Sequence, residues 1–262
     1  MNPIRRLLWW AADYLYAGRH QLAVLSLPWT VGLPRPTPPA WRTGDPGLPE
    51  IVLLPGVYEH WTFLRPLGSA IADAGYRVRV IHGLGMNRRS VPDTAARLTR
   101  ALAKDPVPPA GRVLVAHSKG GLIGKRALLD ADAAAAALPA ETGRGRRGAA
   151  PADLGLRGLV AVATPFAGSW MARLLPLDPS IREFRPDDAT IRTLGVELAV
   201  NARIVSVFGP YDPHIPEGSR LEGAMNIEVP SPGHFRLLGS ASTHRAVIDG
   251  IRHVSDPGID TP

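Results

Sequence analysis

A single serine stands out because of the residues around it. Ser118 lies in the segment Ala116-His-Ser-Lys-Gly120, directly after the apolar run Val113-Leu-Val115. Small residues two positions before and after a serine are typical of a sharp strand-to-helix turn, because larger side chains would collide with the neighbouring backbone. Such a turn exposes the hydroxyl for nucleophilic attack. The alternative is an ordinary turn in which the serine only caps the following helix.

A serine hydroxyl is a weak nucleophile near neutral pH, and it needs a histidine base that is oriented by an acid. Asp212 follows the expected strand 204–208, and His234 follows the next expected strand, 226–229. The carboxyl ends of consecutive parallel strands meet at one edge of a sheet, where ligand sites form. We therefore expect Ser118 to be the nucleophile, His234 the base and Asp212 the orienting acid.

Other acids and histidines compete for the last two roles. Asp212 could instead cap its turn, which is a common role for aspartate in loops. The alternative acids are Asp178, Asp187 and Asp188, and the alternative bases are His214, His244 and His253. These histidines lie before the last expected strand or at the final expected helix, so none is placed as well as His234. His117 adjoins the nucleophile, but successive side chains diverge on a tight turn, and we expect it to be structural.

Further motifs give the chain a resemblance to the α/β-hydrolase family, and within it to the bacterial lipases and esterases. Over roughly residues 50–250, the resemblance rests on the turn at Ser118, on Asp212 and on three motifs: Leu54-Pro-Gly-Val57, Thr164-Pro-Phe-Ala-Gly-Ser169 and Gly233-His234. Two departures are present. Ala116 replaces the usual glycine before the serine, and Pro55-Gly56 replaces the usual His-Gly. The resemblance implies a mainly parallel sheet with helices on both faces and a short lid.

The resemblance also implies the remaining parts of a site. The oxyanion of a tetrahedral intermediate needs backbone N–H donors. Lys119, directly after the nucleophile, supplies one of them, and the resemblance assigns the other to Val57. The residues expected to bind substrate are Tyr58, Glu59, Trp61, Thr164 and Phe166. Trp61 also fits a core position, and Thr164-Pro165 also fits a simple strand end.

The alternation of strands and helices independently predicts an α/β fold with a mainly parallel sheet. The expected strands are 51–54, 77–81, the run that ends before Ser118, 159–162, 204–208 and 226–229. The expected helices are 60–74, 92–104, 186–199 and about 240–252, besides the one that follows Ser118. Helical crossovers between such strands are right-handed, so the strands share one direction.

The chain divides into one catalytic domain and three less regular segments. We expect the α/β-hydrolase domain over 51–253, with a small lid within 165–200. The other segments are a proline-rich extended linker at 28–50, a flexible loop at 131–150 and a carboxy-terminal tail at 254–262.

We expect residues 1–27 to form an amphipathic helical extension. Apolar side chains such as Leu8, Leu15 and Leu22 recur at helical spacing, beside tryptophans, tyrosines and arginines. Asp13 and other polar residues interrupt the apolar pattern too early for a membrane span or a signal peptide. Two interpretations are open: residues 1–26 contact a membrane surface peripherally, or they pack on the domain itself or on a second subunit.

Composition limits the classes of ligand and partner. The formal net charge is +7 and the pI is near 10.3, but arginine supplies nearly all the basic residues and no nucleic-acid-binding module is recognisable. We therefore expect a small-molecule or lipid ester as substrate and no nucleic acid. The absence of cysteine excludes thiolate metal sites, and histidines are not spaced as metal ligands. We expect no metal and no organic cofactor.

The sequence thus predicts a serine hydrolase that cleaves carboxylic esters, like an esterase or lipase, through an acyl-enzyme on Ser118. An acyltransferase or amidase would use the same three residues. A non-catalytic binding or membrane-surface protein of the same fold is the third interpretation. We expect a cytoplasmic location, with peripheral membrane attachment as the alternative, and the sequence leaves the oligomeric state open.

Overall fold

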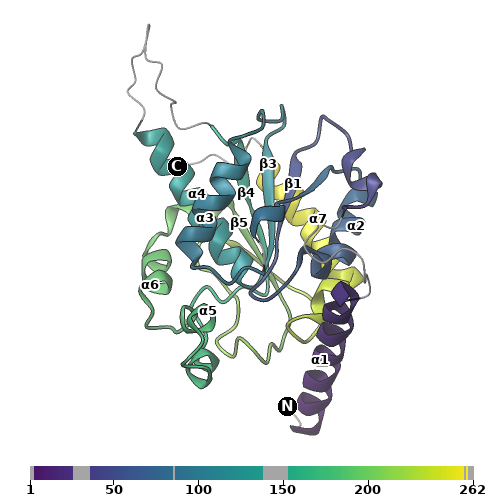
Figure 1. The fold of residues 1–262 in the computed structure, drawn as a ribbon, viewed down its shortest axis with the longest axis vertical. Coiled ribbons are helices and arrows are strands. Elements are labelled where there is room, and N and C mark those ends of the chain that lie inside the picture. The colour runs from purple at the N-terminus through teal and green to yellow at the C-terminus, as the bar shows by residue number, and fades with distance from the viewer. Residues whose placement is uncertain (1–2, 26–35, 85, 138–152, 257, 259–262) are drawn as a thin grey trace, which may run out of the picture.

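The computed structural model describes residues 3–25, 36–84, 86–137, 153–256 and 258. A six-stranded sheet forms its centre, with the strand order β2-β1-β3-β4-β5-β6 and parallel pairing throughout (Figure 1). The strands are β1 (Glu50–Leu54), β2 (Val78–Val80), β3 (Arg112–His117), β4 (Leu156–Val162), β5 (Ile204–Phe208) and β6 (Met225–Glu228). The expected parallel α/β sheet is confirmed.

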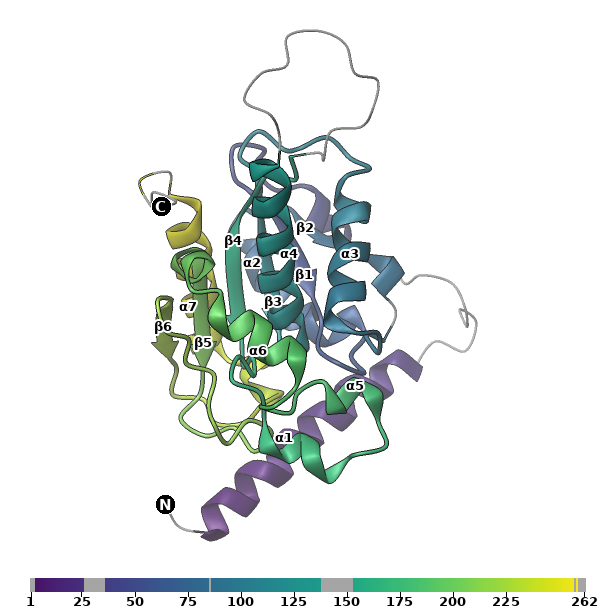
Figure 2. The ribbon, with the colours of Figure 1, turned by 90° about the vertical axis from the view of Figure 1, so that its left-hand side faces the viewer.

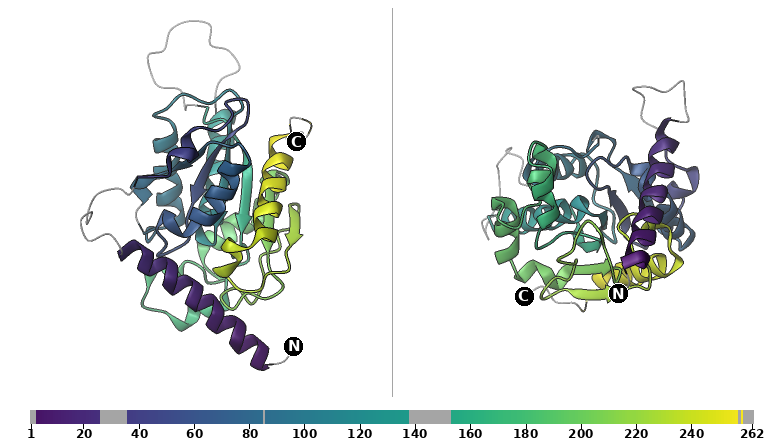
Figure 3. Two further views of the ribbon diagram at one scale, coloured as in Figure 1. Left: turned by 90° about the vertical axis from the view of Figure 1, so that its right-hand side faces the viewer. Right: turned by 90° about the horizontal axis from the view of Figure 1, so that it is seen from below.

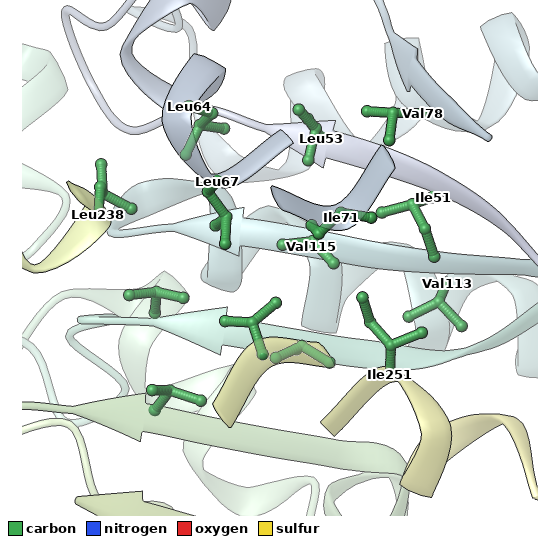
Figure 4. Close-up of a cluster of buried hydrophobic side chains, with 14 of the residues drawn as sticks. Ile51, Leu53, Leu64, Leu67, Ile71, Val78, Val113, Val115, Leu238 and Ile251 are labelled. Carbon is green, nitrogen blue, oxygen red and sulfur yellow. The ribbon is translucent and has the colours of Figure 1, made fainter. Parts of the chain in front are cut away.

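Helices cover both faces of this sheet. One face carries α2 (Arg65–Asp73) and α7 (Ala241–Ser255), and the other carries α3 (Val91–Leu102), α4 (Lys119–Ala136) and α6 (Ala189–Val196). Side chains alternate along the strands, so Val113 and Val115 join the first cluster while Leu114 joins the second. Figure 4 shows the first cluster, in which Leu67 of α2 and Ile251 of α7 pack against strand residues. Burial on both faces explains why the central strands are continuous apolar runs.

Shorter helical segments connect these elements. They are η1 (Pro39–Arg42), η2 (Trp61–Leu64), η3 (His82–Leu84), η4 (Trp170–Leu174), α5 (Pro179–Arg182), η5 (Ala199–Arg203) and η6 (Arg236–Gly239). The expected helix 60–74 therefore begins as a 3-10 turn and becomes α-helical at Arg65. The expected helix 186–199 is shorter, because Asp188 caps α6 by accepting the N–H of Thr190 at 2.8 Å. The segment between β4 and β5, which holds η4, α5 and α6, occupies the position expected for the lid.

The strand register brings the candidate residues to one edge of the sheet. Leu54 of β1 pairs with Ala116 of β3, and Ala116 pairs with Ala161 of β4. The chain order reverses at the boundary between β1 and β3, since β2 lies on the outer side of β1. Ligand sites of open parallel sheets form at such a switch point. The loops that follow β1, β3, β5 and β6 meet there.

The amino-terminal helix α1 (Pro3–Leu25) crosses this same edge (Figures 2 and 3). The expected helix is present, and it packs on the domain through one face. Among the described residues, no helix is long and apolar enough to span a membrane.

Parts of the irregular segments lie outside the described residues. In the proline-rich segment, residues 28–35 are outside, whereas η1 places Trp41 in the core with only 1% of its surface exposed. The described part of this segment is therefore anchored by a tryptophan and is not a free extended linker. In the expected loop 131–150, α4 continues to Ala136 and residues 138–150 are outside. Of the expected tail, residues 257 and 259–262 are outside.

Candidate active site

Ser118 occupies a strained turn between β3 and α4. Its backbone dihedrals are φ 51° and ψ −121°, a conformation that costs a residue with a side chain about 1–3 kcal/mol. A Cβ at Gly120 would lie 2.3 Å from the carbonyl oxygen of Leu54, and a Cβ at Gly121 would lie 2.0 Å from Oγ1 of Thr164. Only glycine fits at these two positions, which explains the small residues in the sequence pattern.

Hydrogen bonds from β4 and the following loop hold this turn. The N–H of Ser118 donates to the carbonyl oxygen of Val162 at 2.9 Å, and the carbonyl oxygen of Ser118 accepts the hydroxyl of Thr164 at 3.0 Å. Thr164 is fully buried under the turn. The structure therefore gives Thr164 a place in the support of the nucleophile and not in the wall of a substrate pocket.

His234 and Asp212 form a buried pair at the same edge. Nδ1 of His234 lies 2.7 Å from Oδ2 of Asp212. The other carboxylate oxygen, Oδ1, accepts the backbone N–H of His214 at 2.8 Å and of Ile215 at 3.1 Å. These bonds fix the carboxylate, and the carboxylate fixes the orientation of the imidazole.

Burial and charge act in opposite directions on this pair. Burial alone would raise the pKa of Asp212, but the charge and hydrogen bond of His234, together with the backbone N–H and charge of His214, leave the pKa lowered. Burial alone would lower the pKa of His234, but the charge and hydrogen bond of Asp212, together with the charges of Asp13 and Glu59, leave the pKa raised. Near neutral pH, Asp212 is therefore a carboxylate, and His234 is a strengthened base.

The alternative acids and the nearest alternative base have other partners. Asp178 accepts the hydroxyl of Tyr58 and caps α5, Asp187 pairs with Arg173 at the surface, and Asp188 caps α6. His214 lies beside His234, with ring centroids 5.0 Å apart. Burial and the nearby His234 lower the pKa of His214 to about 4. The geometry thus pairs His234 with Asp212 and with none of the other acids.

His117 connects the nucleophile turn to the histidine loop. Its Nε2 lies 3.0 Å from the carbonyl oxygen of His234, and its Nδ1 lies 2.7 Å from Oε1 of Glu59. Because His117 precedes Ser118 in the chain, this contact seats the His234 loop beside the nucleophile. Among the described residues, the Ser118 hydroxyl itself forms no hydrogen bond. Bonds between nucleophile and base are often long before substrate binds.

Glu59 has a different place from the one expected. It is 3% exposed, and its Oε2 accepts the backbone N–H of Gly56 at 2.7 Å while Oε1 contacts His117. Glu59 therefore ties the loop after β1 to the residue beside the nucleophile and does not face a substrate. A buried histidine next to a nucleophile needs an acceptor, and this requirement was the signal in the sequence that could have identified Glu59.

The two expected oxyanion donors lie on the loops that these contacts hold. In the described part of the chain, neither the N–H of Val57 nor the N–H of Lys119 donates to another protein group. Lys119 is the first residue of α4, where N–H groups have no partner within the helix. Its side chain is buried and donates to the carbonyl oxygen of Arg89 at 2.6 Å, and Nζ lies 3.1 Å from Glu183. Lys119 thus also ties the turn to the segment after β4.

The remaining expected substrate residues lie partly in the core. Trp61 is 5% exposed and packs edge-to-face on Trp41, with ring centroids 5.6 Å apart. Phe166 is 6% exposed and belongs to the second core cluster. Tyr58 is partly exposed and has a positive φ of 61° in the loop after β1. Of the five, Tyr58 is the residue that is open to solvent at this edge.

A groove of about 670 Å³ adjoins the pair. Its walls come from α1, η4 and the loop after β5, and they include Arg6, Trp10, Trp170 and Asp212. Neither Ser118 nor His234 lines it. Within the described residues, no cluster of three or more histidines and carboxylates is arranged to hold a metal ion.

Solved structures share this architecture. The chain has the α/β-hydrolase fold. It is similar to the lipase BlEst2 of Bacillus licheniformis at 15% identity, with a TM-score of 0.59 over 79% of this chain and 94% of that one. It is also similar to a metagenomic carboxyl esterase, MGS0156, at 16% identity, with a TM-score of 0.52 over 86% of this chain and 81% of that one.

A third similar structure belongs to a larger protein. Lipase B of Aspergillus fumigatus matches at 15% identity and a TM-score of 0.60, over 84% of this chain and 56% of that one. No protein-family model matches the sequence, and no curated protein matches it. At these identities the likeness establishes the α/β-hydrolase fold, which confirms the expected architecture.

Proposed function

We propose that the chain is a serine hydrolase that cleaves carboxylic esters through an acyl-enzyme on Ser118. The observation that carries the proposal is the buried Asp212–His234 pair, at 2.7 Å, which His117 joins to the strained turn of Ser118 by a contact of 3.0 Å with the carbonyl oxygen of His234. The α/β-hydrolase fold supports it, and so do the structurally similar proteins, which are named as lipases and a carboxyl esterase.

The residues would act in a fixed order. Oγ of Ser118 attacks the ester carbonyl carbon while Nε2 of His234 takes the hydroxyl proton. The N–H groups of Val57 and Lys119 bind the oxyanion that forms. His234 then gives its proton to the leaving alcohol as the carbon–oxygen bond breaks. Water attacks the resulting acyl-enzyme by the same route and releases the acid. Asp212 stabilises the imidazolium in both halves.

A fluorophosphonate probe tests the nucleophile directly. We expect it to label the protein, and we expect Ser118→Ala to abolish labelling and to lower the turnover of p-nitrophenyl esters by roughly 10⁶. Ser255→Ala is the matched control, since Ser255 lies at the end of α7 and its hydroxyl bonds only within that helix. A loss below tenfold in folded Ser118→Ala protein would rule out the mechanism.

Two further measurements define the reaction. p-Nitrophenyl esters of graded acyl length show which acid is preferred. Added alcohol shows whether an acceptor other than water takes the acyl group, because a transferase would form a new ester in place of free acid. A folded protein that neither reacts with the probe nor cleaves any ester would support the non-catalytic interpretation.

We also propose that the outer face of α1 contacts an anionic membrane surface. Ile4, Leu7, Leu8 and Leu15 are 63–77% exposed there. The single acid of the helix is buried, whereas Arg19 is exposed, so the outer face is apolar without acidic groups. Interfacial helices combine such features.

Vesicle sedimentation tests this contact. We expect binding to vesicles of phosphatidylglycerol and phosphatidylcholine, and loss of binding in the double variant Leu8→Glu, Leu15→Glu, with unchanged turnover of a soluble ester. Equal vesicle binding by the variant would contradict the proposal. A dimer in solution that the variant converts to monomer would assign the face to a second copy of the chain instead.

A further inference from the structure

The amino-terminal helix sends one acid into the active-site edge. Asp13 is the only acid in α1, and it is fully buried. Its Oδ2 accepts the backbone N–H of His234 at 3.0 Å, and its Oδ1 accepts those of Phe235 at 2.8 Å and Arg236 at 2.9 Å. Hydrogen bonds from N–H groups to a carboxylate are stronger than those between neutral groups. One side chain therefore holds three consecutive amides of the loop that carries His234.

The local sequence of that loop fits the carboxylate. The three amides lead into η6 (Arg236–Gly239), whose first N–H groups have no partner within the helix. Gly233 precedes them with φ 110°, and a Cβ there would lie 2.6 Å from Oδ1 of Asp13. The glycine is needed because the carboxylate comes this close to the backbone.

The same helix also contacts the loop that carries the acid. The ring of Trp9 lies 5.8 Å from that of Tyr211, next to Asp212 in the chain. The ring of Tyr14 lies 5.4 Å from that of His214 and 6.3 Å from that of Phe235. Thus α1 spans both loops and fixes one relative to the other.

The backbone and ring of His234 are consequently held at three points. Asp13 binds its N–H, His117 lies 3.0 Å from its carbonyl oxygen, and Asp212 lies 2.7 Å from Nδ1. Among the described residues, the other ring nitrogen forms no hydrogen bond. A shift of the loop by an ångström would move that nitrogen away from Ser118.

We propose that Asp13 is a positioning residue, and that α1 is a part of the catalytic apparatus that sets His234 in place for Ser118. This inference rests on the proposed serine hydrolase. The charge of Asp13 provides a second effect. Burial lowers the pKa of His234, the charge and hydrogen bond of Asp212 raise it, and the charge of Asp13 raises it further.

The test compares Asp13→Asn with Asp249→Asn. Asp249 is an exposed aspartate of α7, where it pairs with Arg252 at 2.8 Å. In Asp13→Asn the amide nitrogen must face backbone N–H groups, so at least one of the three bonds is lost. We expect kcat to fall by about tenfold to a hundredfold, the scale of an ångström misplacement, with little change in KM. The acid limb of the kcat/KM profile should move to lower pH, because a negative charge near His234 is removed. Asp249→Asn should match the unmodified protein in both.

The outcomes separate this inference from the proposed function. If Ser118→Ala loses labelling while Asp13→Asn keeps the unmodified kcat and pH profile, only the positioning role is overturned. A lower melting temperature with unchanged kcat and profile also overturns it, since Asp13 would then act only on stability. If folded Ser118→Ala keeps its turnover, the proposed function fails first.

A measurement on the unmodified protein covers the case in which Asp13→Asn does not fold. Hydrogen exchange should show the amides of residues 234–236 protected together with those in the middle of α1, because both depend on the same contact. Rapid exchange at 234–236 beside a protected α1 would overturn the proposal.

Discussion

Two buried histidine–carboxylate pairs lie side by side at the active-site edge. His234 and Asp212 are joined through Nδ1 at 2.7 Å, and His117 and Glu59 are joined through Nδ1 at the same distance. The two imidazole rings are 4.7 Å apart between centroids. Both pairs are nearly excluded from solvent. By residue type, separation and burial, the pairs are almost the same.

The pairs differ at the second ring nitrogen. Nε2 of His117 lies 3.0 Å from the carbonyl oxygen of His234, and a carbonyl oxygen can only accept, so this nitrogen carries a proton. Nε2 of His234 forms no hydrogen bond to the described residues and can take a proton. A carboxylate partner is therefore not enough to make a histidine a base. What decides is whether the opposite nitrogen is kept free.

Asp212→Asn disrupts the first pair, and we expect it to have the largest effect on kcat/KM of the variants compared. Oδ1 of Asp212 already accepts two backbone N–H groups, so the amide oxygen takes that side and the amide NH₂ faces Nδ1 of His234. The proton must then sit on Nε2, which can no longer accept the proton of Ser118. We expect kcat/KM to fall by about 10⁴ in ester hydrolysis. Asp188→Asn, at the cap of α6, is the control. A loss below about tenfold would show that Asp212 does not orient the base.

His117→Ala removes one member of the second pair, and we expect its main effect to be on the stability of the fold. It leaves the carboxylate of Glu59 buried without the imidazole that it contacts at 2.7 Å, and removal of one member of a buried pair costs about 3–5 kcal/mol. We expect urea unfolding to show a loss of this size in the free energy of unfolding. The double variant His117→Ala, Glu59→Gln should recover part of it, because the buried charge is gone. Unchanged stability in His117→Ala would contradict a stabilising pair at this position.

Glu59→Gln makes in the second pair the same change that Asp212→Asn makes in the first. Oε2 of Glu59 accepts the N–H of Gly56, so the amide oxygen takes that side and the amide NH₂ faces Nδ1 of His117. Nδ1 of His117 must then accept from the amide, while Nε2 keeps the proton that the carbonyl oxygen of His234 requires. All hydrogen bonds keep partners, and we expect kcat/KM to fall by less than about tenfold. A loss as large as that of Asp212→Asn would mean that the pairs are not distinguished by their free nitrogen.

The sequence predicted the contact between His234 and Asp212, but it did not predict the contact between His117 and Glu59. Asp212 and His234 each follow a strand that is recognisable by its apolar run, and parallel strands end at one edge. Chain order and strand position therefore brought them to the edge that carries Ser118. The resemblance to the α/β-hydrolases implied that Trp61 and Phe166 line a pocket, but their large apolar surfaces are buried in the core.

The roles of Glu59 and Asp13 could not be predicted from the sequence for a different reason. Their roles depend on burial and on contacts across the fold, since Asp13 bonds to residues at the opposite end of the chain. In the sequence, Asp13 only interrupts an apolar helical pattern, and nothing there indicates its partners. Strand and helix periodicity report which face is buried, but not which backbone groups at that face need an acceptor.

The smallest expected effect is a shift in the pH midpoint of kcat/KM, which depends on the pKa of His234. Burial lowers the pKa of His234, but Asp212, with smaller contributions from Asp13 and Glu59, raises it, so the pKa lies above the ordinary 6.5. Activity requires neutral His234, and kcat/KM should therefore rise with pH through a midpoint above 6.5. The residual activity of Asp212→Asn should rise through a lower midpoint, because a neutral amide stabilises the imidazolium less. His214→Gln is the matched control: its pKa of about 4 makes His214 neutral throughout this range, so the midpoint should stay near that of the unmodified protein. An equal or higher midpoint in Asp212→Asn would assign the titrating group to a residue outside the His234–Asp212 pair.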